Sequence, residues 1–209
     1  MILEGIVTTI NVDGSVNISP MGPIVEPDMT QLTLRPYETS ATLQNLLRTK
    51  QGVFHVTDDV ELLARAAVDR LEVMPPLVRA AKIDGWILAD ACRWYAFEVR
   101  EVDTGEPRAR LQAAVLDRGR IRDFFGLNRA KHAVVEAAIL ATRLGFLPID
   151  EVRGEMRRLA VLVEKTGGPA EHRAFRFLGD FIQAEASSSA AGVTDHGSGP
   201  TASGIESTP

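Results

Sequence analysis

The chain is poor in cysteine: Cys92 is the only one among 209 residues. A single cysteine excludes a disulfide within the chain, and paired-cysteine motifs of zinc or redox sites are absent. We expect Cys92 to be a small buried apolar residue, because nothing beside it in the sequence marks a reactive thiolate. The four histidines lack the spacing of metal ligands, so no metal site is expected. His55 lies in an apolar run and is expected to have a structural role.

Positive charge is also scarce. Lys and Arg number 23 against 28 Asp and Glu, a formal net charge of -5. General nucleic-acid binders carry a surplus of positive charge, so we expect no nucleic-acid partner. The N-terminus has no basic segment typical of a secretory signal, and the longest apolar helical run, residues 133–141, is too short for a membrane span. A cytoplasmic protein without a membrane partner is expected.

The common catalytic signatures are missing. The sequence contains no HExxH, no GxxxxGK[ST], no GxSxG, and no GxGxxG after a predicted strand. These absences argue against the usual zinc peptidases, phosphate-loop enzymes, α/β-hydrolases and Rossmann dinucleotide sites.

The first 127 residues are rich in β-type patterns. Alternating apolar and polar residues predict antiparallel strands with one buried face, and Asp13-Gly14 predicts a hairpin turn. One helix should start after Ser40 as N-cap and end at Gly52; another should be capped by Asp58 or Asp59. The expected strands are 2–11, 16–19, 31–35, 53–56, 94–102 and 108–117, and the second helix spans 60–71 before Pro75-Pro76.

The pattern changes to helices after residue 127. The expected helices are 128–144, with Gly145 as C-cap; 150–165, with Asp150 as N-cap; and 169–185, with Pro169 in the first turn. Of the last 24 residues, 19 are Ser, Gly, Ala, Thr or Pro, too little apolar surface to offset the entropy of ordering. We therefore expect a barrel-like domain over 1–127, a helical segment over 128–185 and a disordered tail over 186–209.

One candidate binding segment runs from residue 7 to residue 22. Its return strand leaves through Asn17-Ile18-Ser19-Pro20-Met21-Gly22, where Pro20 and Gly22 limit bulk and release backbone groups from the ladder. A planar heteroaromatic ring needs such a flat apolar surface with polar groups along its edge. The alternative is a tight turn that merely leaves the barrel.

A second candidate segment covers residues 35 to 45. A strand ends at Arg35, and a helix begins after Ser40 with hydroxyl groups at Thr39 and Thr42. A helix N-terminus offers free N–H groups and a partial positive charge, and an arginine adds two parallel donors, which together suit a phosphate. The alternative is simple capping by Ser40 with Arg35 in solvent.

The order of these segments resembles the DUF447 family of FMN-binding split-barrel proteins. Residues 4–22 match the family's Glu-x-x-Val-Thr-Thr-x-Asn-x-x-Gly-x-x-Asn-x-(Ser/Ala)-Pro-Met-Gly pattern. The match continues through 35–45 and through Phe-Phe-Gly-Leu-Asn-Arg-Ala at 124–130, so it spans about residues 1 to 185. Flavin reductases and flavoredoxin are similar more loosely.

The resemblance implies a mainly β protein with helices: a homodimer of antiparallel split barrels, each with a C-terminal helical segment and one FMN in a groove near the dimer interface. It places the isoalloxazine against Ser19, Pro20, Met21 and Gly22. It places the phosphate or ribityl chain at Arg35, Ser40 and Thr42, with Tyr37 and Asn45 nearby. Asn128-Arg129 would supply a further cation or a structural contact. Glu38 departs from the expected chemistry, because an acid weakens a phosphate loop unless it points outward.

The implied activity is that of a flavin-dependent oxidoreductase, in which FMN carries hydride or electron transfer. The electrons would come from a nicotinamide or deazaflavin compound or from another small molecule that the sequence does not identify, and no residue stands out as a catalytic acid or base. Two other functions remain open: a non-catalytic protein that binds or senses flavin, and a structural dimer with an empty groove.

Overall fold

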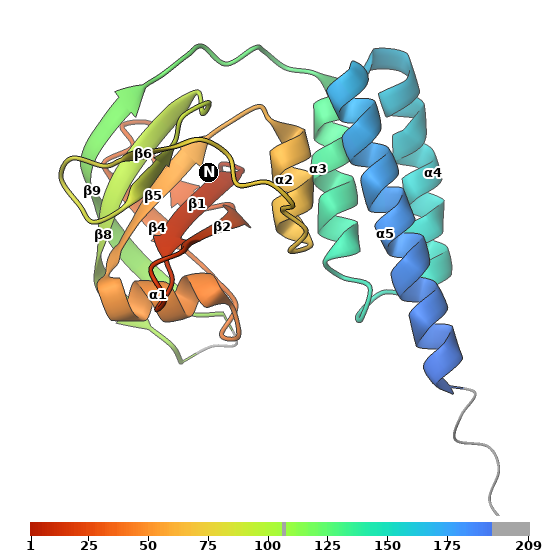
Figure 1. Ribbon diagram of the computed structural model, residues 1–209, viewed down its shortest axis with the longest axis horizontal. Helices are drawn as coiled ribbons and strands as arrows, with labels where there is room; N and C mark the ends of the chain where they lie inside the picture. Colours follow the sequence, from red (N-terminus) through yellow and green to blue (C-terminus); the bar gives the residue numbers. More distant parts are fainter. Residues whose placement is uncertain (106–107, 194–209) are drawn as a thin grey trace, which may run out of the picture.

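The chain forms a curled β-sheet on one side and a group of helices on the other (Figure 1), as described by a computed structural model for residues 1–105 and 108–193. The strands are β1 (Gly5–Ile10), β2 (Val16–Met21), β3 (Ile24–Val25), β4 (Gln31–Leu34), β5 (Gln51–Val56), β6 (Leu77–Arg79), β7 (Trp86–Leu88), β8 (Arg93–Asp103) and β9 (Arg110–Arg120). The helices are α1 (Ala41–Thr49), α2 (Val60–Ala67), α3 (Arg129–Ala141), α4 (Ile149–Thr166) and α5 (Pro169–Val193).

The main sheet is antiparallel throughout and almost closes on itself. Its seven strands follow the order β2-β1-β5-β8-β9-β4-β3. The residues just before β1 then meet β3 at the opposite edge: Ile2 bridges Ile24, and the N–H of Val25 donates to the carbonyl of Met1 at 2.8 Å. This contact closes one end into a barrel and leaves a split between β2 and β4. The predicted antiparallel split barrel is therefore confirmed.

Apolar side chains fill the barrel, and α1 closes its lower end in Figure 1. Alternation along each strand sends every second side chain inward, and α1 adds Leu43 and Leu46 to the same cluster. The other main members are Val7, Leu32, Leu34, Phe54, Tyr95, Phe97, Val99 and Leu111.

Helix α1 begins as predicted but ends earlier. The Ser40 hydroxyl accepts the N–H of Leu43, which confirms the N-cap. The helix stops at Thr49, because Lys50 adopts a left-handed backbone with φ of 58°. The predicted stop at Gly52 was wrong: that glycine lies inside β5, where a Cβ would come within 2.7 Å of the Phe97 ring. Its small size serves sheet packing.

The second helix is also shorter than predicted, and a hairpin follows it. Asp59 caps α2, but the helix ends at Ala67, and Asp69 adopts φ of 58°. The segment beyond, interpreted from sequence as a simple break, contains β6 and β7, which pair as a two-stranded sheet. Ile83 and Ile87 from this region cover the outer face of the barrel at Val53 and Ala96.

The C-terminal helices pack on the barrel through α2, which lies between β2 and α3 (Figure 1). Small residues let α3 approach its neighbours closely; these are Ala130, Ala133, Ala137, Ala138 and Ala141, all buried. None of the helices in the described part of the chain is long and apolar enough to cross a membrane.

The ends of these helices differ from prediction in three places. Helix α3 stops at Ala141, three residues before the predicted end, and Gly145 does not cap it. Pro148, not Asp150, stands at the N-cap of α4 and makes no side-chain cap bond, since Asp150 is already inside the helix. Pro169 begins α5 as predicted, and the helix continues past Glu185 to Val193. The rest of the predicted tail, 194–209, lies outside the described residues.

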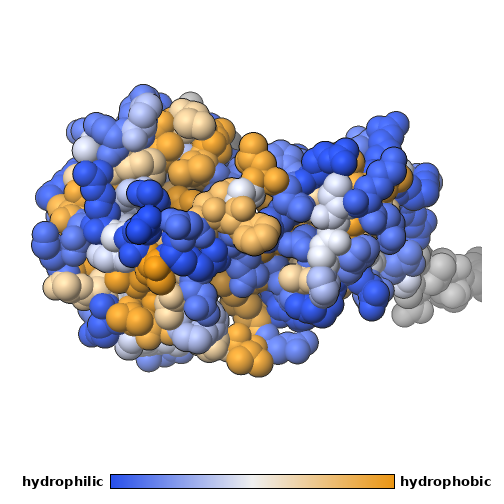
Figure 2. Space-filling model, turned by 90° about the horizontal axis from the view of Figure 1, so that it is seen from above, coloured by the Kyte–Doolittle hydropathy of each residue, from blue (hydrophilic) through white to orange (hydrophobic). Residues whose placement is uncertain are grey.

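A linker of residues 121–128 carries the chain from β9 to α3 across the top of Figure 1. It carries exposed Phe124, Phe125 and Leu127. Figure 2, which looks onto this side, shows apolar side chains gathered over the middle of the face, between barrel and helices.

Candidate functional site

The two predicted binding segments lie on the two sides of the split in the barrel. On one side, Asn17, Ser19 and Met21 share the inner face of β2, because Ser19 pairs with Val7, a core residue of the barrel. On the other side, β4 ends and leads into α1. Continuing the register of β3 with β4 would set Gly22 opposite Arg35, but the pairing ends at Ile24 and Thr33.

A buried polar network joins these two sides. The side-chain amide of Asn17 donates to the hydroxyls of Thr9 on β1 (3.1 Å) and Thr42 in α1 (3.0 Å). The amide of Asn45 in α1 donates to Thr9 (3.0 Å) and to Asn11 (2.8 Å). Thr9, Thr42 and Asn45 are at most 4% exposed. Such buried polar groups hold a fixed geometry because each unmade bond carries a desolvation penalty.

Thr42 and Asn45 therefore hold α1 against β1 and β2, and their side chains are already engaged in hydrogen bonds. The phosphate-side groups with free capacity are Arg35 and the first turn of α1. Arg35 is exposed, and its guanidinium makes no bond within the described residues. Ser40 takes the N–H of Leu43, no acidic residue lies in the first turn, and the N–H groups of Ala41 and Thr42 have no partner there. A cation and two backbone donors suit an anion.

Tyr37 has a partner of its own. The guanidinium of Arg108 lies over the Tyr37 ring, 4.0 Å from its centroid, and donates to the phenol oxygen. This pair ties the loop before α1 to the start of β9. Glu38 is exposed, and its backbone carbonyl accepts from Gln44 at 3.3 Å.

The Ser19–Gly22 segment divides between two faces. Ser19 and Met21 face the barrel, whereas Pro20 faces the other way beside Ile6. The strand runs through Pro20, although it was predicted to stop before it, because the outer edge of β2 forms no ladder and needs no N–H there. Gly22 sits at the bend, where a Cβ would come within 2.8 Å of Ile2.

Asn128 is structural. Its carboxamide oxygen accepts the N–H groups of Ala130 (2.8 Å) and Lys131 (3.1 Å), and its amide donates to the carbonyl of Thr166 at 3.0 Å. It caps α3 and holds α4. Arg129 is exposed and makes no bond within the described residues.

An ionic cluster that the sequence did not indicate joins barrel and helices. Asp58, only 7% exposed, accepts from Arg122 at 2.5 Å and from the N–H of Phe125 at 2.9 Å. Lys131 donates to the carbonyl of Asp58 and pairs with Glu171 at 2.9 Å. Burial would raise the pKa of Asp58, but the bonds from Arg122 and Phe125 and the nearby positive charges lower it to about 2.

The predicted structural roles of two further residues are confirmed. His55 is fully buried; Nδ1 bonds the carbonyl of Ile6 at 3.2 Å, and Nε2 accepts the N–H of Leu88 at 3.0 Å. Burial lowers the pKa of His55 to about 4, which keeps the ring neutral. Cys92 is buried, and burial raises the pKa of its thiol.

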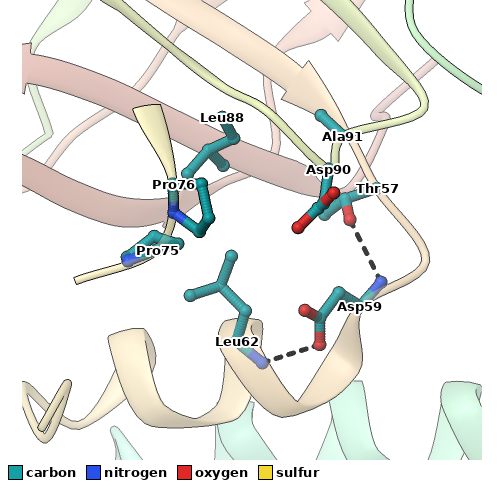
Figure 3. A pocket seen from close by; sticks show the side chains of 8 residues that line it. All are labelled: Thr57, Asp59, Leu62, Pro75, Pro76, Leu88, Asp90 and Ala91. Carbon is teal, nitrogen blue, oxygen red and sulfur yellow. Dashed lines mark hydrogen bonds between the residues drawn. The ribbon is translucent and has the colours of Figure 1, made fainter. Parts of the chain in front are cut away.

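One enclosed pocket lies away from the split, between the start of α2 and β7 (Figure 3). It measures about 40 Å³ and holds the carboxyl groups of Asp59 and Asp90. Asp59 is occupied as the helix cap, accepting from Leu62 at 3.0 Å. This volume admits a few waters but no flavin. Within residues 1–105 and 108–193, no three His, Cys, Asp or Glu side chains gather as a metal site.

Sequence reasoning did not count Thr9, Asn11 and Asn17 among the site residues. All three lie in the first binding segment. The sequence signal was their position on the same face of the hairpin that the Asp13-Gly14 turn forms. Buried polar side chains on two paired strands need hydrogen-bond partners. Thr42 and Asn45 of α1 supply them.

Comparisons with known proteins agree with this architecture. A solved structure of an FMN-bound DUF447 protein from Methanosarcina mazei is 24% identical, covers 86% of this chain and 94% of its own, and superposes with a TM-score of 0.74. Flavoredoxin from Methanosarcina acetivorans is 8% identical, with 57% of this chain and 68% of its own covered and a TM-score of 0.51. Both likenesses concern the fold. No curated protein matches the chain.

Two family models match consecutive parts of the chain. The one described as "Protein of unknown function (DUF447) N-terminal domain" matches residues 3–122, and "Protein of unknown function (DUF447)", the C-terminal part, matches residues 128–180. The boundary between them falls in the linker before α3. The chain belongs to the DUF447 family.

Proposed function

We propose that this chain binds FMN in the split between β2 and α1 and acts as a flavin-dependent oxidoreductase. The observation that carries the proposal is the arrangement of the two binding segments on opposite sides of one opening, joined by the Asn17–Thr42 hydrogen bond. The FMN bound to the Methanosarcina mazei protein of the same family supports it.

The dimensions of β2 agree with an extended ligand along its inner face. From Asn17 to Met21 the strand advances about 13 Å at about 3.3 Å per residue. The phosphate would lie at the first turn of α1 with Arg35, and the ring would lie toward Ser19, Met21 and Gly22. Pro20, on the opposite face of β2, would act by shaping the strand, and Tyr37 by holding the loop with Arg108.

Bound FMN would supply hydride or electron transfer, and the protein would supply binding and orientation. Arg35 would balance the phosphate charge, and the buried network would fix the distance between the two halves of the site. We propose a homodimer with the groove near the interface. The carboxylate of Glu4 lies beside Gly22, 3.0 Å from the place a Cβ would take there; we assign it no acid or base role, because the cofactor would carry the chemistry.

Reduction of the loaded protein tests the oxidoreductase function. The FMN-loaded chain is mixed, in the absence of oxygen, with NADH, NADPH or a reduced deazaflavin. Its visible flavin absorption should disappear within about a second, the time scale of typical enzyme turnover. Bound flavin that stays oxidised with every donor, while dithionite still bleaches it, would favour the non-catalytic flavin-binding function.

A further inference from the structure

Three exposed arginines lie together at the end of the barrel opposite α1, which is its upper end in Figure 1. Arg93 on β8 pairs with Arg120 on β9, and Arg118 pairs with Tyr95 on the same two strands. Residues directly opposite each other in an antiparallel pair share one face of the sheet. Tyr95 belongs to the barrel core, and Val56, which pairs with Arg93, packs against that core. All three arginines therefore project from the inner face of the barrel, and we call them the arginine rim.

A β-bulge turns both arginines of β9 to this face. Val115 pairs with Phe97, but the next pair is Asp117 with Ala96, so Leu116 is an extra residue on β9. Strict alternation along the strand would have sent the two arginines to the outer face. Bulges that re-aim side chains in this way are common next to active sites.

The arginine rim has few partners of opposite charge. The side chain of Arg93 makes no bond within residues 1–105 and 108–193. Arg118 donates to the backbone carbonyl of Asp28 at 2.8 Å, and Arg120 pairs with Asp123, whose side chain is 83% exposed. Among the described ion pairs, the three guanidinium groups thus share one carboxylate. They retain donors for an anion from solution.

An apolar layer of the barrel core lies beside the rim and is only partly buried. Its members are Met21, Met29, Val56 and Val115. Met29 adopts a left-handed backbone with φ of 53°, which is uncommon for a residue with a side chain and occurs preferentially at functional sites. Guanidinium groups around an apolar surface suit a ligand that has an apolar body and an oxyanion at its edge.

An open cavity of about 290 Å³ adjoins this layer. It is lined by Met29, Thr30 and residues 115–118, so it reaches from the apolar layer to Arg118. The carboxylate of Asp117 in this lining accepts the N–H of Arg118 at 3.0 Å and lies 3.9 Å from Lys82. Small-molecule sites begin at about 300 Å³. The volume therefore suits a compact molecule and not a whole dinucleotide.

We infer that the arginine rim binds the carboxylate or phosphate group of a small organic substrate whose apolar body lies on the apolar layer. Met21 belongs both to this layer and to the segment proposed for the flavin ring, so the substrate would lie beside the flavin. The inference rests on the proposed function for the reaction, whereas the anion site itself does not require flavin.

Isothermal titration calorimetry on the full-length chain tests this site, with benzoate as the anionic probe and benzamide as a neutral probe of the same shape. Benzamide should bind about tenfold more weakly than benzoate, because it cannot form charge-assisted hydrogen bonds with arginine. Phenyl phosphate, titrated in the same way, shows by its affinity relative to benzoate which of the two anionic groups the rim prefers.

Substitution of single arginines locates the site. Arg93→Gln should weaken benzoate binding on the order of tenfold or more, and its fold should survive because the Arg93 side chain is exposed and makes no bond within the described residues. Arg100→Gln is the matched control, since Arg100 is an exposed arginine of the same strand that pairs with Glu98. Its affinity for benzoate should equal that of the unchanged chain.

Three outcomes would overturn the site: no binding of either anion, equal binding of benzoate and benzamide, or unchanged benzoate binding in Arg93→Gln. The affinity for FMN is measured on the same variants and should be unaffected by Arg93→Gln. A parallel loss of FMN affinity would make the rim the site of the flavin phosphate and would also overturn the inference. Benzoate binding that depends on Arg93 in a chain that takes up no FMN would contradict the proposed cofactor and leave the anion site standing.

Discussion

The side-chain amide of Asn17 on β2 donates a hydrogen bond of 3.0 Å to the hydroxyl of Thr42 in the first turn of α1. This bond crosses the split of the barrel and joins segments 25 residues apart in the sequence. It sets the distance between the surface proposed for the flavin ring and the helix end proposed for its phosphate.

A double-mutant cycle measures this link. Asn17→Ala and Thr42→Val each remove one partner, and their effects on unfolding free energy should be non-additive by about 1 kcal/mol, the net worth of a hydrogen bond. Urea unfolding of the four proteins gives the coupling. Asn17→Ala combined with Thr33→Val, whose hydroxyl bonds Gln112 on β9, should be additive. Additivity in both pairs would show that the bond carries no stability.

Arg35→Ala should weaken FMN binding by about one to two decades, since a charge-assisted hydrogen bond contributes roughly 1.5–3 kcal/mol. Flavin fluorescence quenching on titration gives the dissociation constant. Arg100→Ala is the matched control: Arg100 is an exposed arginine on β8 paired with Glu98, and its loss should leave the affinity unchanged. Full affinity in Arg35→Ala would move the phosphate elsewhere.

Much of the fold follows from local sequence patterns. The Asp13-Gly14 turn, the Ser40 and Asp59 caps and the long strands near 94–102 and 108–117 depend on neighbouring residues, and the structure contains all of them. The stop at Gly52 failed because Phe97, distant in sequence, needs that space. The short β6–β7 hairpin was missed because its packing on Val53 and Ala96 is tertiary.

The candidate site was predictable only in part, for the same reason. Its two segments stood out as motifs, but the partners of Thr42 and Asn45 lie on β1 and β2. Asp58 looked like an alternative helix cap, whereas its role depends on Arg122, 64 residues away.

Asp58→Asn should destabilise the chain by about 1–3 kcal/mol at neutral pH, because Arg122 loses its charged partner. The pKa of Asp58 is about 2 in the folded chain against an ordinary 3.8. The folded state therefore binds fewer protons between these values, and this stability is lost as the pH falls from about 4 to about 2. Chemical unfolding gives the free energy of unfolding of both proteins at pH 7 and at pH 2.5. The difference between Asp58→Asn and the unchanged chain should be smaller at pH 2.5.

The control for that experiment is Asp123→Asn, which removes the exposed partner of Arg120. A surface ion pair of this kind contributes about 0–1 kcal/mol. If Asp58→Asn costs no more than Asp123→Asn at pH 7, the cluster does not hold barrel and helices together.

His55 should make the fold sensitive to mild acid. The pKa of His55 is about 4 when folded and 6.5 ordinarily, so the unfolded chain binds a proton that the folded chain refuses. Stability should fall as the pH drops from about 6.5 to about 4, by up to about 3 kcal/mol. Chemical unfolding across this pH range should show the same fall in His172→Gln, because the His172 side chain is partly exposed in the unchanged chain. In His55→Gln the fall should disappear. A flat profile for the unchanged chain over this range would contradict the buried neutral ring.

The most direct test of the proposed cofactor is the visible absorption spectrum of the chain purified without added flavin, followed by mass spectrometry of any chromophore released on denaturation. We predict a flavin spectrum and FMN as the released molecule. A colourless protein that also fails to take up added FMN would contradict the flavin site.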